Sequence, residues 1–139
     1  MKVALFGATG FVGSYIFDSL IDEGFNPSVL IREKSKDKLN IPENINTVFG
    51  DIGDLGAIQE TMNGADVVIY NIGIIREFPK QGITFQKLHF EGLKKCVDTA
   101  QRLKVQRFIL MSAHGVKEDG TGYQSSKYKA EQYLKQSNL

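Results

Sequence analysis

Cysteine and tryptophan are almost absent from this chain of 139 residues, which has one cysteine, Cys96, and no tryptophan. A single cysteine excludes an internal disulfide and a zinc site built from several thiolates. An excess of one charge is also lacking, because 17 basic residues face 16 acidic ones. No basic field therefore points to nucleic acid, and no run of about 18 apolar residues points to a membrane span.

The chain also lacks internal repeats, low-complexity segments and a signal peptide. Its apolar start, residues 2–6, meets a glycine-rich turn too early to be the core of a signal sequence. Hydrophobic content of 42% and charged content of 24% are those of an ordinary globular protein. We therefore expect a single cytoplasmic domain over residues 1–139.

Short apolar runs alternate with helical patterns along the chain. Strands are expected at 2–6, 27–32, 46–49, 65–71 and 107–111, helices at 11–23, 55–62, 84–104 and 123–136, and loops at 33–43, with one helical turn, and 74–82. Such alternation predicts an α/β fold whose parallel sheet is covered on both faces. Right-handed crossovers give a doubly wound, Rossmann-like sheet in the order 3-2-1-4-5. A ligand is then expected at the carboxyl ends of the first and fourth strands.

The longest predicted helix, 84–104, has a buried stripe that includes Cys96. The stripe comprises Phe85, Leu88, Leu93, Cys96, Val97, Ala100 and Leu103. Cys96 therefore faces the core, and we interpret it as a packing residue rather than a reactive thiol. His89 lies beside this stripe, where a hydrogen-bonded packing role and a functional role both remain open.

A glycine-rich segment, GATGFVG at 7–13, links the first strand to the first helix. Gly7 suits a tight turn, Gly10 lets a pyrophosphate approach the backbone, and Gly13 lets the helix pack closely on the sheet. The exposed N–H groups and the positive helix end would hold the phosphates of a dinucleotide. No Gly-Lys-Ser/Thr follows, so this is not a Walker loop. The predicted phosphate-binding residues are Gly7, Thr9, Gly10, Phe11, Val12 and Gly13.

Arg32 stands at the end of the second strand, where NAD-binding folds usually place an acid that binds the ribose 2′-hydroxyl. An arginine at that point suits a 2′-phosphate, so the sequence favours NADP over NAD. Glu33 follows directly and keeps NAD open as the alternative.

Tyr123 and Lys127 are four residues apart and so share one face of the last predicted helix. Tyrosine is a useful acid-base catalyst when its pKa falls from about 10 toward neutrality. A neighbouring ammonium and a helix N-terminus both favour the phenolate. Ser112 ends the fifth strand at the same sheet edge and could hydrogen-bond a substrate carbonyl.

Five motifs together resemble the short-chain dehydrogenase/reductase superfamily: GATGFVG, Gly50-Asp51-Ile52, YNIG at 70–73, RFILMSAHGV at 107–116 and YQSSK at 123–127. The details are similar to its extended and atypical branches, which include NAD-dependent epimerase/dehydratases. The pattern is most similar to the branch of the NAD(P)-binding accessory subunit of respiratory complex I. The resemblance implies that Ser112 polarises the substrate, Tyr123 exchanges a proton, and Lys127 holds the nicotinamide ribose and lowers the pKa of Tyr123.

The same resemblance implies how the rest of the cofactor is bound. Asp51 and Ile52 would flank the adenine, and Asn71, Ile72 and Gly73 would line the adenosine side of the cleft. Ile72 stands where the family usually has alanine. His89 stands where the family often has an asparagine that supports the active-site lysine through water. For His114 in the loop after Ser112, solvent exposure is expected, with substrate contact as the alternative.

The resemblance leaves two functions open. The first is an NAD(P)-dependent oxidoreductase or epimerase, or its cofactor domain. The second is a non-catalytic dinucleotide-binding module, either a redox sensor like the NmrA regulators or a structural subunit like the complex I protein. Members of the superfamily continue with a sixth strand and a substrate-binding region. We therefore expect residues 1–139 to be a fragment or a truncated product whose edge strand, 107–111, is covered by a missing segment or by a homodimer partner.

Overall fold

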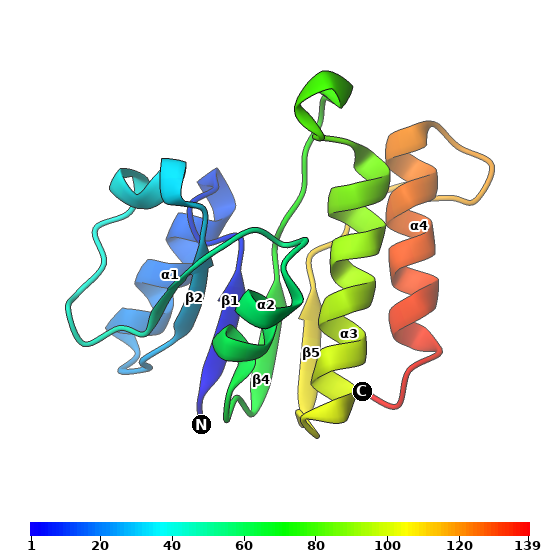
Figure 1. The fold of residues 1–139 in the computed structure, drawn as a ribbon. Coiled ribbons are helices and arrows are strands. Elements are labelled where there is room, and N and C mark those ends of the chain that lie inside the picture. Colours follow the sequence, from blue (N-terminus) through cyan, green and yellow to red (C-terminus); the bar gives the residue numbers. More distant parts are fainter.

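The computed structural model describes all residues from Met1 to Leu139 as a five-stranded parallel sheet flanked by helices (Figure 1). The strands are β1 Val3–Phe6, β2 Ser28–Ile31, β3 Thr47–Phe49, β4 Val67–Tyr70 and β5 Arg107–Leu110. The α-helices are α1 Phe11–Asp22, α2 Leu55–Met62, α3 Gly92–Arg102 and α4 Gly122–Lys135. The sheet order, β3-β2-β1-β4-β5, confirms the predicted Rossmann-like topology.

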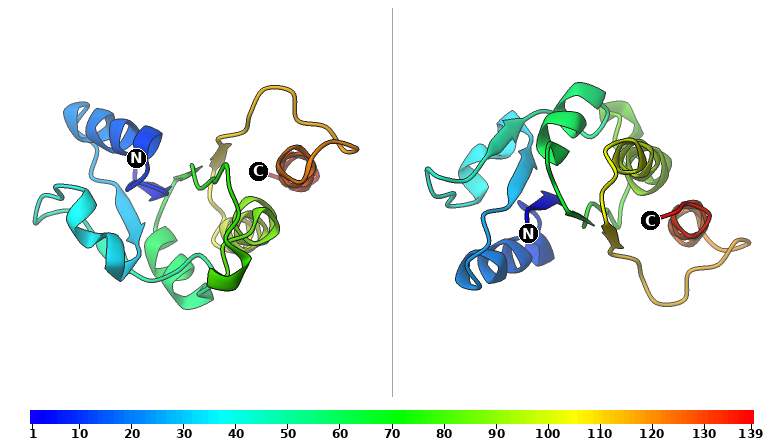
Figure 2. Two further views of the ribbon diagram at one scale, coloured as in Figure 1. Left: turned by 90° about the horizontal axis from the view of Figure 1, so that it is seen from above. Right: turned by 90° about the horizontal axis from the view of Figure 1, so that it is seen from below.

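The helices form two layers on opposite faces of the sheet. Seen along the strands, α1 lies on one side, and α2 and α3 lie on the other with α4 beside α3 (Figure 2). The alternation of side chains along β1 explains this division, since Leu5 packs with Phe17 of α1 while Phe6 packs in the core that α3 covers. None of the helices has the length and hydropathy that a membrane-spanning segment needs.

The predicted helix 84–104 consists of two parts. A π-helix, Gln86–Glu91, leads without a break into α3. π-helical turns inside a helix are frequent at functional sites. Here the turn lies over the end of β4, where the Tyr70 hydroxyl donates a hydrogen bond of 2.7 Å to the Leu88 carbonyl. The 3₁₀-helices Glu33–Lys38 and Pro79–Gln81 fall in the two segments predicted as loops.

Some large apolar side chains face solvent. Leu103 is 42% exposed, so the predicted stripe of the long helix ends one turn earlier, at Ala100. Phe11 and Tyr15 are 82% and 64% exposed and pack edge to face on each other. Helices lie on both faces of the sheet, as expected. The cluster under α1 reaches β1, β2 and, through Ile69, β4, but it contains no residue of β5, and Ile109 of β5 is exposed.

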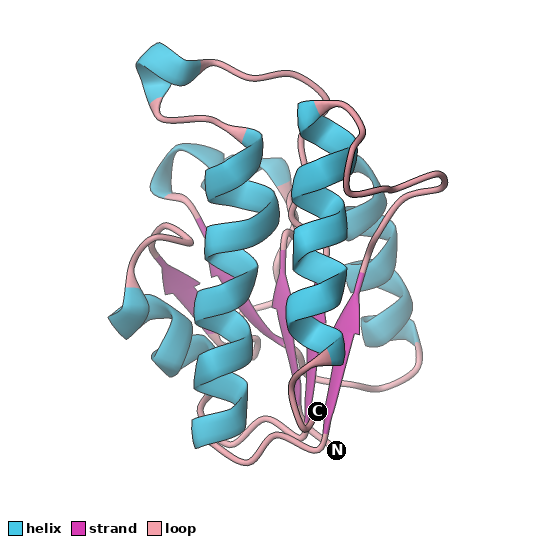
Figure 3. Cartoon of the chain, turned by 90° about the vertical axis from the view of Figure 1, so that its right-hand side faces the viewer, coloured by secondary structure: helices cyan, strands magenta, loops and turns pink.

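Helix α4 begins sharply at Gly122. Thr121 and Gln124 form a capping box, in which each side chain binds the backbone N–H of the other residue. This cap fixes the first turn of α4 at the edge of the sheet where the strands end. Figure 3 shows α4 standing beside the preceding helix along its length.

Helix α1 presses directly on the turn that follows β1. A Cβ atom placed on Gly13 would overlap the Gly7 carbonyl oxygen and lie 2.8 Å from its carbonyl carbon. The same addition at Gly10 would meet that oxygen at an ordinary 3.6 Å. The two glycines therefore have different tasks: Gly13 is required by packing, whereas Gly10 leaves space free.

These contacts predict unequal effects of the same substitution. Gly13→Ala forces backbone apart and should lower the free energy of unfolding by about 3 kcal/mol or more. Gly10→Ala changes an N-cap glycine and should cost about 1 kcal/mol or less. Urea denaturation of both variants and of the wild type measures the difference. Equal stability of Gly13→Ala and Gly10→Ala would contradict the packing role of Gly13.

Candidate dinucleotide site

A cavity of about 330 Å³ lies at the carboxyl ends of β1 and β4, where the strand order reverses. This is the place that the topology predicted for a ligand. The predicted residues that line it are Gly7, Thr9, Gly10, Arg32, Asp51, Ile52, Asn71, Ile72 and Gly73. Sequence reasoning missed Leu30, Lys38, Gly50, Ile74, Arg76, Phe78, Ile83 and Leu88, which complete the lining.

The glycine turn forms the floor of the cavity. Gly7 has φ +96°, a left-handed conformation that favours glycine, and a side chain there would meet Asn71 at 2.9 Å. The first N–H groups of a helix have no partner within the helix. In α1 the N-cap is Gly10, so no capping side chain binds these groups either. Such a helix end attracts phosphate. Phe11, Val12 and Gly13, predicted with this loop, belong to the first turn of α1 and do not line the cavity.

The lining of the cavity is rich in cations, which come from the segments after β2 and β4. These are Arg32, Lys38 and Arg76, against the single carboxylate of Asp51. Glu33, which kept an acidic ribose contact open, pairs with Lys36 at 3.4 Å and lines a neighbouring hollow instead. This balance of charge suits a ligand that carries several phosphates.

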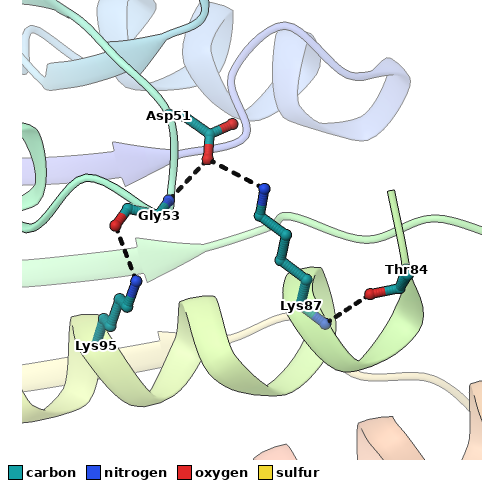
Figure 4. Close-up of polar contacts among 5 residues, drawn as sticks. All are labelled: Asp51, Gly53, Thr84, Lys87 and Lys95. Carbon is teal, nitrogen blue, oxygen red and sulfur yellow. Dashed lines mark hydrogen bonds and ion pairs between the residues drawn. The ribbon is translucent and has the colours of Figure 1, made fainter. Parts of the chain in front are cut away.

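Asp51 is held by the turn after β3 and by the long helix (Figure 4). Its Oδ1 atom accepts a hydrogen bond of 2.8 Å from the Gly53 N–H and lies 3.7 Å from Nζ of Lys87. Further along the same helix, Nζ of Lys95 donates a hydrogen bond of 2.8 Å to the Gly53 carbonyl. Two lysines of one helix thus hold the Asp51 turn from both sides and fix that wall of the cavity.

Tyr123 and Lys127 lie on one face of α4, and neither of them lines the cavity. Lys127 is buried, its Nζ atom donates to the Met111 carbonyl at 3.2 Å, and the same atom lies 5.9 Å from the centre of the Tyr123 ring. Burial lowers the pKa of Lys127, which the Glu131 carboxylate partly offsets. A Cβ atom on Gly73 of the cavity wall would lie 3.2 Å from this ammonium, so Lys127 stands next to the cavity.

Ser112 follows β5 and contacts α4 at Glu131, not at Tyr123. Its hydroxyl donates a hydrogen bond of 2.6 Å to Oε1 of Glu131, one turn beyond Lys127. Tyr123, by contrast, lies one turn before Lys127 and packs against Phe85. The hydroxyl of Ser112 is therefore directed toward Glu131 in this structure. His114 is exposed in the following loop.

His89 is the buried polar residue whose contacts sequence reasoning could not supply. Only 1% of it is exposed, and both ring nitrogens are bonded: Nε2 to the Ile74 N–H at 3.0 Å and Nδ1 to Oγ of Ser126 at 2.9 Å. Burial and the nearby Lys127 ammonium lower the pKa of His89 to about 4. The one signal in the sequence was its position beside the buried stripe.

This pKa predicts a loss of stability in mild acid. Because the folded state holds His89 neutral, its contribution is complete above the unfolded pKa of about 6.5 and is lost as the pH falls toward 4. Between pH 7.5 and pH 5 the free energy of unfolding should fall by about 2 kcal/mol from this group. Denaturant titrations of His89→Gln should lack this term. His114→Gln, at the exposed histidine, is the control and should keep it; a pH dependence shared by all three proteins would contradict the prediction.

Comparison with known proteins agrees with this geometry. The NAD(P)H-binding family matches residues 7–139. A ceramide reductase of Caulobacter vibrioides is 31% identical over 126 residues, which are 90% of this chain and 39% of that protein. The 40 kDa subunit of the mitochondrial NADH-ubiquinone oxidoreductase of Neurospora crassa is 29% identical over 114 residues, covering 79% of this chain and 30% of the relative. The chain thus spans well under half the length of these curated relatives.

Solved structures share the fold. WbmH of Bordetella bronchiseptica, determined with NAD⁺, superposes with a TM-score of 0.80 at 21% identity over 99% of this chain and 52% of that one. A UDP-glucuronic acid 4-epimerase of Bacillus cereus, determined with NAD, gives a TM-score of 0.76 at 16% identity over 100% of this chain and 54% of that one. The chain therefore belongs to the NAD(P)H-binding family and has a Rossmann-like fold.

Proposed function

We propose that this chain is the cofactor domain of an NAD(P)-dependent oxidoreductase or epimerase in which Tyr123 exchanges a proton with the substrate. The observation that carries the proposal is the buried ammonium of Lys127 beside the Tyr123 ring, next to the wall of the cavity. Burying a lysine is costly unless its charge is used or paired. Here Nζ has a carbonyl as its hydrogen-bond partner, and its remaining protons are free to bind a ligand hydroxyl.

Each group of the site has a defined task in this proposal. The dinucleotide, when bound, supplies or accepts the hydride. The glycine turn and the first turn of α1 bind its phosphates, and Asp51 with Ile52 borders its adenine. Lys127 binds the nicotinamide ribose and holds its charge beside the Tyr123 ring. Tyr123 then gives a proton to a substrate carbonyl oxygen, or takes one from a hydroxyl.

Ser112 is proposed to hydrogen-bond the same substrate oxygen. Its hydroxyl proton is directed to Glu131 in this structure, so this role requires the hydroxyl to turn away from Glu131 when the substrate binds. The partner in that bond is a carboxylate on α4 that also lies 3.7 Å from Lys135. Glu131 therefore keeps a counter-charge when Ser112 leaves it.

A second candidate function is a non-catalytic dinucleotide-binding module, a sensor or a structural subunit. The observation that favours it is the same Ser112–Glu131 hydrogen bond, which withholds one of the three proposed catalytic groups. The similarity to the 40 kDa subunit of the Neurospora crassa oxidoreductase is compatible with a structural role. In such a module Tyr123 would serve packing only, against Phe85 and His89.

NADP is the proposed cofactor rather than NAD. Arg32 lines the cavity at the end of β2, and Lys38 lines it from the following 3₁₀-helix. A 2′-phosphate at this point would meet two cations, whereas a 2′-hydroxyl would find no carboxylate after β2, because Glu33 pairs with Lys36. Charge-assisted contacts of this kind favour the phosphorylated cofactor.

Removal of the Tyr123 hydroxyl should separate the two candidate functions. With reduced cofactor and a panel of carbonyl compounds, Tyr123→Phe should slow turnover by about 100-fold or more, since general acid catalysis contributes that much. Tyr128→Phe, on the same helix, is the matched control and should leave turnover unchanged. Equal turnover by wild type and Tyr123→Phe would refute the assigned role and leave the binding module.

Calorimetry with both oxidised cofactors should rank them. We expect NADP⁺ to bind about 10-fold more tightly than NAD⁺, as one or two charge-assisted contacts provide. Arg32→Gln should remove most of this preference. Lys34→Gln changes a lysine of the same segment that neither lines the cavity nor pairs with Glu33, and should preserve it. Tighter binding of NAD⁺ by the wild type would overturn the assignment.

A further inference from the structure

His89 joins two segments that are far apart in the sequence. On one side lies Ile74, in the loop that follows β4 and lines the cavity. On the other lies Ser126, in α4 between Tyr123 and Lys127. Ser126 itself is 4% exposed and does not line the cavity. The imidazole is therefore a direct polar link between the cavity wall and the helix that carries Tyr123 and Lys127.

The two contacts of the ring independently require the same tautomer. The Ile74 backbone N–H can only donate, so Nε2 must accept and carry no proton. The Ser126 hydroxyl donates to the Tyr123 carbonyl at 3.0 Å, so its oxygen must accept from a protonated Nδ1. The neutral ring with its proton on Nδ1 satisfies every group, and a chain of three hydrogen bonds runs from Ile74 to the Tyr123 backbone.

We propose that His89 is a positioning residue that couples the wall of the dinucleotide cavity to the catalytic helix α4. The link fixes the Ile74 loop and the first turn of α4 relative to each other, so that the cavity and the Tyr123–Lys127 pair keep one mutual geometry. This inference rests on the proposed function of that pair and adds to it a residue that contacts neither substrate nor cofactor.

The packing around the ring supports a fixed position. Phe85 stacks on the imidazole with centroids 5.4 Å apart, and the Tyr123 ring meets it edge-on at 5.2 Å. The π-helix turns the His89 side chain toward α4 while the Leu88 carbonyl is bound by Tyr70. Two ionisable side chains face the ring, Lys127 and Tyr123. The Lys127 ammonium disfavours a proton on both nitrogens of His89, and the neutral Tyr123 phenol adds no charge.

Four variants distinguish coupling from general stabilisation. His89→Leu removes both ring contacts, and His89→Gln replaces the ring by an amide that can donate and accept. Ser126→Ala removes only the contact with α4. Leu93→Ala, at a fully buried position of α3, destabilises the core without touching the link and is the control.

Calorimetric titration with NADP⁺ gives the first readout. If the link contributes about as much as one hydrogen bond, His89→Leu should raise the dissociation constant of NADP⁺ about 5-fold. Ser126→Ala should raise it as well. The double variant should bind no more weakly than His89→Leu, because both changes break one link. His89→Gln should bind within about 2-fold of wild type, as should Leu93→Ala. Unchanged affinity in Ser126→Ala, or effects that multiply in the double variant, would overturn the coupling.

Amide hydrogen exchange of the free protein gives the second readout and does not depend on cofactor binding. The Ile74 amide should exchange faster in His89→Leu and also in Ser126→Ala, where its own partner is still present, but not in His89→Gln or Leu93→Ala. A wild type that binds no NADP⁺ would count against the proposed function, whereas an Ile74 amide unaffected by Ser126→Ala would count against the link itself. ¹⁵N NMR of the His89 ring checks the tautomer, and a proton on Nε2 would also overturn the inference.

Discussion

The parallel pairing of β1 with both β2 and β4 is the constraint on which the cavity depends. The last rung of β1 with β4 joins Phe6 and Tyr70, and the Asn71 N–H still bonds to the Phe6 carbonyl at 2.9 Å. Beyond that bond the two chains must separate, because the crossover from β1 leaves toward α1 and that from β4 toward the opposite face. The space between them is the cavity. Its floor is formed by a turn so close to Asn71 that Gly7 tolerates no side chain.

Much of this framework could be predicted from the sequence, because its causes are local. Apolar runs of four or five residues and the spacing of three glycines each depend on neighbours in the chain. The sheet order then follows from general rules of handedness. Arg32 could be placed at the cavity from its position at the end of the second strand, whereas Asp51 and Asn71 were placed there by the resemblance to the family.

The rest depends on contacts between distant segments. Periodicity assumes a regular α-helix, and the π-helix at Gln86–Glu91 shifts every side chain in that turn, so His89 becomes buried against α4 rather than lying beside a stripe. Periodicity also assumes that an apolar face is covered, and Phe11, Tyr15 and Ile109 are exposed because no helix in residues 1–139 lies over them. Neither effect has a signature within a window of ten or fifteen residues.

The two buried basic side chains beside the cavity, Lys127 and His89, depend on each other electrostatically. A lysine ammonium is strongly hydrated, and in burial Lys127 exchanges that hydration for one carbonyl and the face of an aromatic ring. A protonated histidine next to it would add a second unpaired charge, so the structure fixes His89 neutral by giving Nε2 an N–H donor. The neutral ring leaves Lys127 as the one cation beside Tyr123. The hydrogen-bond chain through His89 thus joins the Ile74 loop to α4 and keeps a second charge away from Lys127.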